Sequence, residues 1–76
     1  MLTDIGRVAG RVWVILGEKG EIDISRLPKI LKIKTHTAYQ AVGWLAREGK
    51  IREEEKDGKT FVSLTREEIN SFKNLF

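Results

Sequence analysis

The sequence predicts an α+β fold, mainly α, in which a central helix passes directly into a two-stranded hairpin. Residues 35–48 place apolar side chains at helical spacing on one side and polar side chains on the other. The next segment alternates apolar and polar residues and turns at Asp57-Gly58. Such a pair is typical of tight hairpins, because glycine accepts a positive φ. Helical spacing also occurs before and after this unit, so helices should dominate the fold.

Length and composition indicate one globular domain, residues 1–76, with a core in 3–64 and a C-terminal helix in 65–76. A chain of 76 residues buries roughly 60% of the surface that it exposes when unfolded. No apolar run approaches the roughly 18 residues of a membrane span, and no secretory signal is apparent. We therefore expect a cytoplasmic protein with no membrane partner.

The residue types that most enzymes and metal sites need are scarce. The chain has no cysteine and a single histidine, His36. Disulfides and thiolate metal sites are thereby excluded. No glycine-rich phosphate loop and no Ser-His-Asp set is evident, and residues 53–55 are glutamates that alternate sides of a strand. We expect no enzyme activity, no catalytic residue, no metal, no cofactor and no small-molecule ligand.

The first helix is predicted over residues 3–16 from the spacing of its apolar residues. Gly6 and Gly10 each weaken it by about 1 kcal/mol relative to alanine, so another element is expected to pack closely there. Trp13 lies at the edge of the apolar stripe and Val14 opposite it. This pattern has two interpretations, a core tryptophan with a tolerated surface valine or a dimer contact.

A short strand and a short helix should follow. Residues 17–20 break the helical pattern, and residues 21–24 alternate like a brief strand. Ser25 is the expected cap of the second helix, and Pro28 falls in its first turn, where its missing N–H costs little. Lys32 occupies the position where a tight helix-to-helix turn often has a left-handed glycine; either lysine adopts that conformation at a cost of about 1 kcal/mol, or the turn is built differently.

The central helix has start and stop signals of its own. Thr35 can cap its N-terminus, and Gly49 suits the left-handed residue that ends a helix. Residues 51–55 and 59–64 should form the two hairpin strands, with Val62 and Leu64 on one side of the returning strand and Phe61 and Ser63 on the other.

The last helix is predicted from a capping box formed by Thr65 and Glu68. Ile69, Phe72 and Phe76 share one face of it. So small a core cannot easily cover all the apolar residues at this end, so the helix is a candidate contact in a homodimer.

Positive charge is concentrated in the middle of the chain. Residues 26–47 contain five basic residues and no Asp or Glu, namely Arg26, Lys29, Lys32, Lys34 and Arg47. Residues 51–76 contain five basic and six acidic residues. A polyanion should therefore meet the middle of the chain.

The order of elements over Ile5 to Leu64 resembles the winged helix-turn-helix superfamily. The stretch 41–51, AVGWLAREGKI, is similar to the signature of a family of small stand-alone winged-helix proteins from bacteria and archaea, whose role is largely unassigned. In the superfamily the third helix usually enters the major groove and the wing lies along the backbone. The resemblance implies duplex DNA as partner, read by helix 35–48 and the wing 56–59 of a transcription regulator or chromatin-associated factor.

The resemblance also implies roles for individual residues. Thr37 and Gln40 match groove-facing positions, with His36 beside them, and glutamine can pair with adenine. Phosphate contacts would come from the basic residues of the middle segment and the wing tip. These residues are Arg26, Lys29, Lys32, Lys34, Arg47, Lys56 and Lys59.

An alternative is a protein-interaction module with Gly43 and Trp44 at the contact surface. Both occupy positions that are often basic in DNA-binding relatives. Trp44 lies roughly 100° from the centre of the apolar stripe and should be partly exposed, unless the wing or the terminal helix folds over it. RNA binding by the same basic residues stays open. The candidates for contact with a protein partner or a second copy are Trp13, Val14, Trp44, Phe72 and Phe76.

Overall fold

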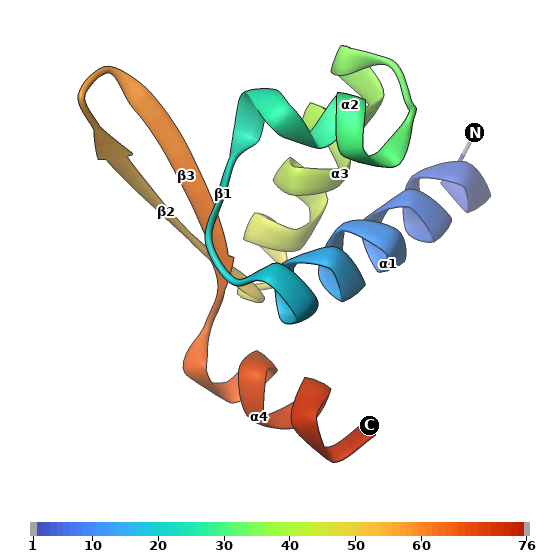
Figure 1. The fold of residues 1–76 in the computed structure, drawn as a ribbon. Helices are drawn as coiled ribbons and strands as arrows, with labels where there is room; N and C mark the ends of the chain where they lie inside the picture. Colours follow the sequence, from blue (N-terminus) through green and yellow to red (C-terminus); the bar gives the residue numbers. More distant parts are fainter. Residues whose placement is uncertain (1, 76) are drawn as a thin grey trace.

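The computed structural model describes the backbone of residues 2–75 and the side chains of residues 5–75. The expected order of elements is confirmed, and the short strand joins the wing to make a three-stranded sheet (Figure 1). The elements are α1 (Leu2–Lys19), β1 (Ile22–Asp23), the 3₁₀ turn η1 (Ile24–Arg26), α2 (Leu27–Leu31), α3 (Thr35–Arg47), β2 (Ile51–Lys56), β3 (Lys59–Leu64) and α4 (Arg66–Leu75).

Helix α1 is longer than the sequence predicts, because Gly17 lies inside it and does not end it. The ring of Phe72, from α4, lies where a methyl group on Gly17 would be, so only glycine allows this approach. The helix ends instead at Gly20, whose φ is +80°. The sequence also predicts that another element packs closely against Gly6 and Gly10, and this prediction is wrong. No described part of the chain outside the helix comes within 4 Å of a methyl group placed on either glycine.

The sheet is antiparallel with strand order β1-β3-β2. Val62 on β3 pairs with Ile22 on β1, and Val62 and Leu64 lie on the side of the strand that faces the core. The hairpin turn is confirmed, with φ of 53° at Asp57 and 76° at Gly58. Because β2 and β3 extend beyond the helices, their tip projects from the body as a wing (Figure 1).

The core lies between α1, α3 and the sheet. Its four largest fully buried side chains come from three different elements, since Val12 and Leu16 lie on α1, Leu27 on α2 and Val62 on β3. Most of the predicted apolar face of α3 is also buried, through Ala38, Ala41, Val42 and Leu45, whereas Ala46, which helical spacing places on the same side, is exposed near the end of the helix. Full burial of one valine or leucine stabilises a fold by about 1.5–3 kcal/mol. This core fixes α3 with its polar side outward.

Two predicted helix caps are wrong. Asp23, not Ser25, caps the short helical segment: its Oδ1 accepts hydrogen bonds from the backbone N of Ser25 at 3.0 Å and from its Oγ at 2.9 Å. These bonds hold the pKa of Asp23 below its ordinary value of 3.8. Thr35 is already helical, and Lys34 occupies the N-cap position without a side-chain bond. Gly49 ends α3 with φ of 72°, as predicted.

Helix α4 is attached to α1 through Glu68 and an aromatic pair. Thr65 Oγ1 accepts a hydrogen bond from Glu68 N at 3.3 Å, which is one half of the predicted capping box. The other half is not made, because Thr65 N donates to the carbonyl of Lys50 and Glu68 Oε1 accepts from Trp13 Nε1 at 2.7 Å. The rings of Trp13 and Phe72 meet edge to face, with centroids 5.5 Å apart.

Candidate nucleic-acid interface

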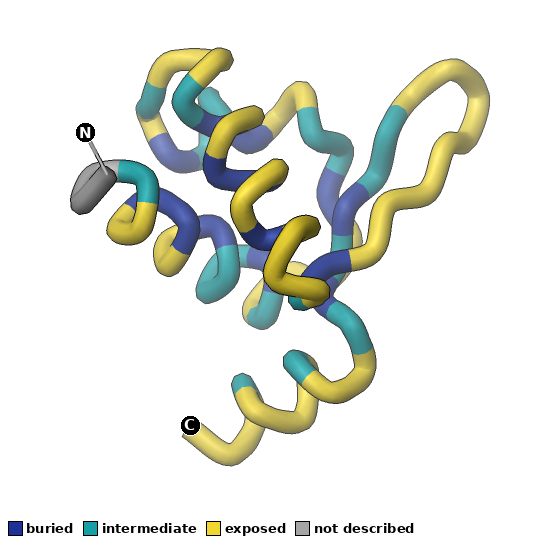
Figure 2. Tube along the Cα trace, turned by 180° about the vertical axis from the view of Figure 1, so that it is seen from behind, coloured by how far each residue is buried: buried dark blue, intermediate teal, exposed yellow. Residues whose placement is uncertain are grey.

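The outer face of α3 carries the residues predicted to contact bases. His36 and Gln40 are exposed one turn apart, and Thr37 beside them is partly buried. Figure 2 shows α3 from this side, with its exposed turns facing outward and the wing next to it. A 13-residue helix is about 20 Å long, which suits insertion into a major groove.

The turn between α2 and α3 is held by a lysine in the left-handed conformation. Lys32 has φ of 58° and ψ of 51°, and its backbone N–H donates to the carbonyl of Pro28. Of the two expected possibilities, the left-handed conformation is the one observed. It costs an L-residue about 1–2 kcal/mol, a cost that glycine would avoid.

Five exposed cations lie in the segment that runs from η1 to the last residue of α3. We call them the basic face, and within residues 5–75 none of them forms an ion pair. Four of them lie in the segment from η1 to the start of α3, and the fifth ends that helix. They are Arg26, Lys29, Lys32, Lys34 and Arg47.

The two lysines of the wing differ from each other. Lys56 Nζ lies 3.0 Å from Glu21 Oε1 and 4.0 Å from Glu54 Oε1, and 5.3 Å from the ring centre of Phe61. Its hydrogen bond to Glu21 raises the pKa of Lys56 above 10.5. Lys59 is exposed and forms no ion pair within 4.0 Å among the described residues, although its charge helps to lower the pKa of Asp23. Of these two cations, Lys59 is therefore the one available to a phosphate.

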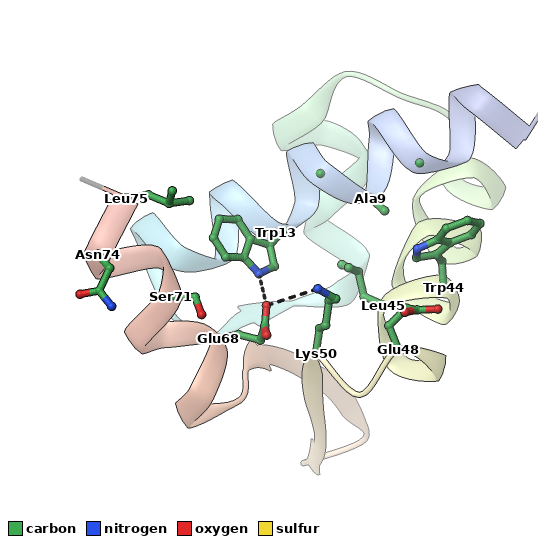
Figure 3. Close-up of a pocket in the computed structure, with 12 residues that line it drawn as sticks. Ala9, Trp13, Trp44, Leu45, Glu48, Lys50, Glu68, Ser71, Asn74 and Leu75 are labelled. Atoms are coloured by element: carbon green, nitrogen blue, oxygen red, sulfur yellow. Dashed lines mark hydrogen bonds and ion pairs between the residues drawn. The ribbon is translucent and has the colours of Figure 1, made fainter.

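A groove lies beside α3, between α1 and α4, with a volume of about 650 Å³. Figure 3 shows Trp44 on the α3 side and Trp13 near α4, with the backbone of α1 between them. Trp44 is 42% exposed, as the sequence predicts. At one edge Lys50 Nζ lies 3.8 Å from Glu68 Oε1, the same oxygen that accepts from Trp13.

The structure places the remaining candidate contact residues in different settings. Trp13 and Phe72 are half-buried against each other. Val14 is half-buried on α1, beside a second, shallow hollow between α1 and α2. Phe76 lies outside the described residues. Gly43 is exposed on α3 and does not line the groove.

One residue of the site could not have been found from the sequence. Glu21 partners Lys56 across 35 positions of sequence separation, and no local pattern connects them.

Among residues 2–75 no helix is long and apolar enough to cross a membrane. In the same part of the chain, no group of three His, Cys, Asp or Glu side chains could hold a metal ion.

The helix-turn-helix, the exposed face of α3 and the hairpin beside it define a class, the winged helix-turn-helix domains. The chain belongs to the family described as "Winged helix-turn-helix domain (DUF2582)", whose match covers residues 1–64. An uncharacterized protein of Methanocaldococcus jannaschii, MJ1608, is 38% identical over 63 residues, 79% of this chain and 89% of that protein.

Solved structures share the same fold. The solution structure of BT2368 from Bacteroides thetaiotaomicron is 35% identical, with a TM-score of 0.75 over 82% of this chain and 76% of that one. The apo form of a ZitR mutant from Lactococcus lactis has a TM-score of 0.81 at 16% identity, over 97% of this chain and 58% of that one. The transcriptional regulator HlyU from Vibrio vulnificus has a TM-score of 0.76 at 19% identity, over 88% and 70%.

Proposed function

We propose that this protein is a non-enzymatic DNA-binding module that places α3 in the major groove of a duplex. The observation that carries the proposal is the basic face, five exposed cations that no described acidic group pairs with. Unpaired cations beside an exposed helix can replace the counterions of a phosphate backbone, and the release of those counterions favours binding. The same cations would be costly to gather without a polyanionic partner, because they repel one another.

Lys32 supports the proposal independently of its charge. Its backbone conformation is one that glycine adopts at no cost, and the chain has lysine there. Local strain of this kind is often found at functional positions. We infer that Lys32 is present for a contact that glycine could not make.

Base contacts are assigned to His36, Thr37 and Gln40, which share the outward side of the first turns of α3. Glutamine can bond both N6 and N7 of adenine, so Gln40 would favour A·T pairs. The wing contributes less than its two lysines imply. Glu53, Glu54 and Glu55 are exposed on β2 and repel phosphate, and Lys56 would have to leave Glu21 to reach it.

The comparisons support this function at the level of the fold. HlyU is described as a transcriptional regulator, and ZitR as a zinc-responsive MarR family member. By analogy we propose a transcription regulator or chromatin-associated factor that acts in the cytoplasm. Zinc response is not carried over, because this chain has no cysteine and one histidine.

The test is a titration of a random-sequence duplex, read by fluorescence anisotropy at several salt concentrations. The unmodified protein should bind with an affinity that falls steeply as salt rises. Because each phosphate contact contributes about 0.9 to the slope of log K against log salt, Lys32→Ala with Lys34→Ala should reduce that slope by about 2.

The matched control removes the same charge elsewhere. Arg66 and Lys73 are exposed on α4, a helix that carries no residue of the basic face, and replacing both with alanine should leave the slope unchanged. If the slope fell by the same amount in the control variant as in the Lys32→Ala, Lys34→Ala variant, net charge alone would explain the effect and the proposal would be overturned. A parallel titration with duplex RNA separates the DNA and RNA alternatives, since tighter RNA binding would reject DNA as the partner.

A second candidate function is binding of a protein partner through Trp44. The observation that favours it is the exposure of that indole beside an open groove. Aromatic residues of this kind are enriched at contacts between proteins.

A further inference from the structure

We propose that the groove between α1, α3 and α4 binds a second copy of this chain, with Trp44 of each copy seated on Gly6 and Gly10 of the other. The proposal identifies the protein that covers the exposed side chain of Trp44 as a second copy of this chain. It does not depend on DNA binding, and its test is made without DNA.

The groove contains both a projecting group and a gap. Trp44 projects from α3 and is 42% exposed. Gly6 and Gly10 line the same groove, and each has open space where a side chain would be. In the isolated chain, these two helix-interior glycines weaken α1 by about 1 kcal/mol each, and no described group outside the helix packs against either one to offset the cost.

The chain already contains one contact of the proposed type. Gly10, Trp13 and Gly17 follow one another at spacings of three and four residues, so they share one side of α1 with Gly6. At the C-terminal end of this side, Phe72 lies against Gly17 and edge to face with Trp13. The N-terminal end has the same glycine surface, and no described aromatic ring covers it.

Residues of opposite charge lie beside the two parts of the proposed contact, an acidic one next to Trp44 and a basic one next to the glycines. Glu48 lines the groove next to Trp44, and its carboxylate has no bond to any other described residue. Arg7 lies beside Gly10 along the neighbouring hollow, is exposed, and is likewise unpaired within the described chain. When Trp44 of one copy covers Gly6 and Gly10 of the other, Glu48 approaches Arg7.

Two-fold symmetry follows from the position of these groups. A symmetric dimer needs one patch that is complementary to itself, so that each residue contact occurs twice. Here the indole and the glycine gap face each other across one groove, so a two-fold axis through the groove makes both contacts at once. Leu75, which is 68% exposed at the groove edge, adds apolar surface to the same contact.

The experiment is sedimentation velocity on the whole chain without DNA, from the micromolar to the millimolar range. The proposal predicts a reversible monomer–dimer equilibrium. Buried tryptophans at the centre of a contact are commonly worth at least about 30-fold in affinity, so Trp44→Ala should weaken the dimer by that factor or more. A monomer at every concentration would overturn the proposal.

A substitution at Gly10 separates an effect on dimerisation from an effect on the stability of the monomer. Gly10→Ala fills open space on a helix, so it should raise the unfolding midpoint of the monomer while it weakens the dimer. The matched control is Gly43→Ala, since Gly43 is also in a helix with open space around it but does not line the groove. This control should gain the same stability and keep the dimer. Unchanged dimerisation in Gly10→Ala would count against the proposed register.

The charge pair gives a third and independent readout. Arg7→Glu alone and Glu48→Arg alone each place like charges together twice in the dimer, and each should weaken it. The chain that carries both substitutions restores the two attractions and should recover most of the affinity. If the double variant loses as much dimerisation free energy as the two single variants lose together, Arg7 and Glu48 do not meet and the proposed arrangement is wrong.

Discussion

Replacing Lys32 with glycine should make the protein more stable and a weaker binder of DNA. The two effects come from different parts of the residue. Its backbone has φ of 58° and ψ of 51°, which glycine adopts without a steric penalty. Its ammonium group belongs to the basic face, and glycine removes that charge.

The size of the stability gain follows from two opposing terms. The left-handed conformation costs lysine about 1–2 kcal/mol, and glycine returns about 0.5–1 kcal/mol of this through its larger entropy in the unfolded chain. The expected net gain in the free energy of unfolding is about 0.5–1 kcal/mol. For a domain of this size, that gain corresponds to a rise in Tm of about 2–8 °C.

Thermal unfolding followed by circular dichroism measures the gain, and duplex titration measures the loss of binding. Lys32→Ala loses the same charge and keeps the strain, so it should bind DNA as weakly as Lys32→Gly and be less stable. Lys29→Gly places glycine in the helical backbone of α2 and should cost about 1 kcal/mol. If Lys32→Gly were less stable than the unmodified protein, or bound DNA equally well, the assignment of Lys32 as a strained phosphate contact would be refuted.

Three further predictions concern the fold. Gly17→Ala should destabilise the protein by about 1–2 kcal/mol because its methyl group overlaps the Phe72 ring, and it should become stabilising by about 1 kcal/mol when Phe72 is also alanine; denaturant unfolding of the four variants checks the change of sign. Leu27→Ala removes a fully buried side chain and should cost about 3 kcal/mol in the same assay; a cost below about 1 kcal/mol would contradict the described core. The ionised form of Asp23 stabilises the fold at pH values above its unfolded pKa, because its folded pKa is lowered, and this contribution is lost as pH falls through the folded pKa. Asp23→Ala should therefore lower Tm at neutral pH, with a gap to the unmodified protein that narrows below pH 3.8; a gap independent of pH would show that the carboxylate charge has no part in it.

Local patterns were sufficient to predict most of the fold. Asp57-Gly58 and Gly49 adopt the positive φ that their positions require, and Lys32 does so although it is not glycine. The buried side of α3 follows from helical spacing alone. These features depend on neighbouring residues, which is why the sequence displays them.

The predictions that failed depend on residues far apart in the chain. Gly17 looks like a helix breaker until Phe72 is known to lie against it. The two halves of the capping box separate because Glu68 bonds Trp13, 55 residues away. Ser25 and Asp23 are both acceptable caps by composition, and only the backbone geometry distinguishes them.

The candidate interface was predictable as a set of residue types but not as a geometry. The acid-free run of cations is visible in the sequence, and so is the exposure of Trp44. The pairing of Lys56 with Glu21 is not, because the two residues meet only when β1 joins the wing in one sheet. The groove depends in the same way on where α4 packs against α1.

The most direct test of DNA binding through α3 is a map of backbone amide NMR signals during titration with a short duplex. The largest shifts should fall on residues 29–40, which cover the turn before α3 and its exposed first turns, with smaller shifts at the wing tip. The amides of Gly6 and Gly10, on the far side of the groove, should move little at a fixed protein concentration. Shifts concentrated in α1 and α4, or no shifts at low salt, would contradict the proposed role of α3.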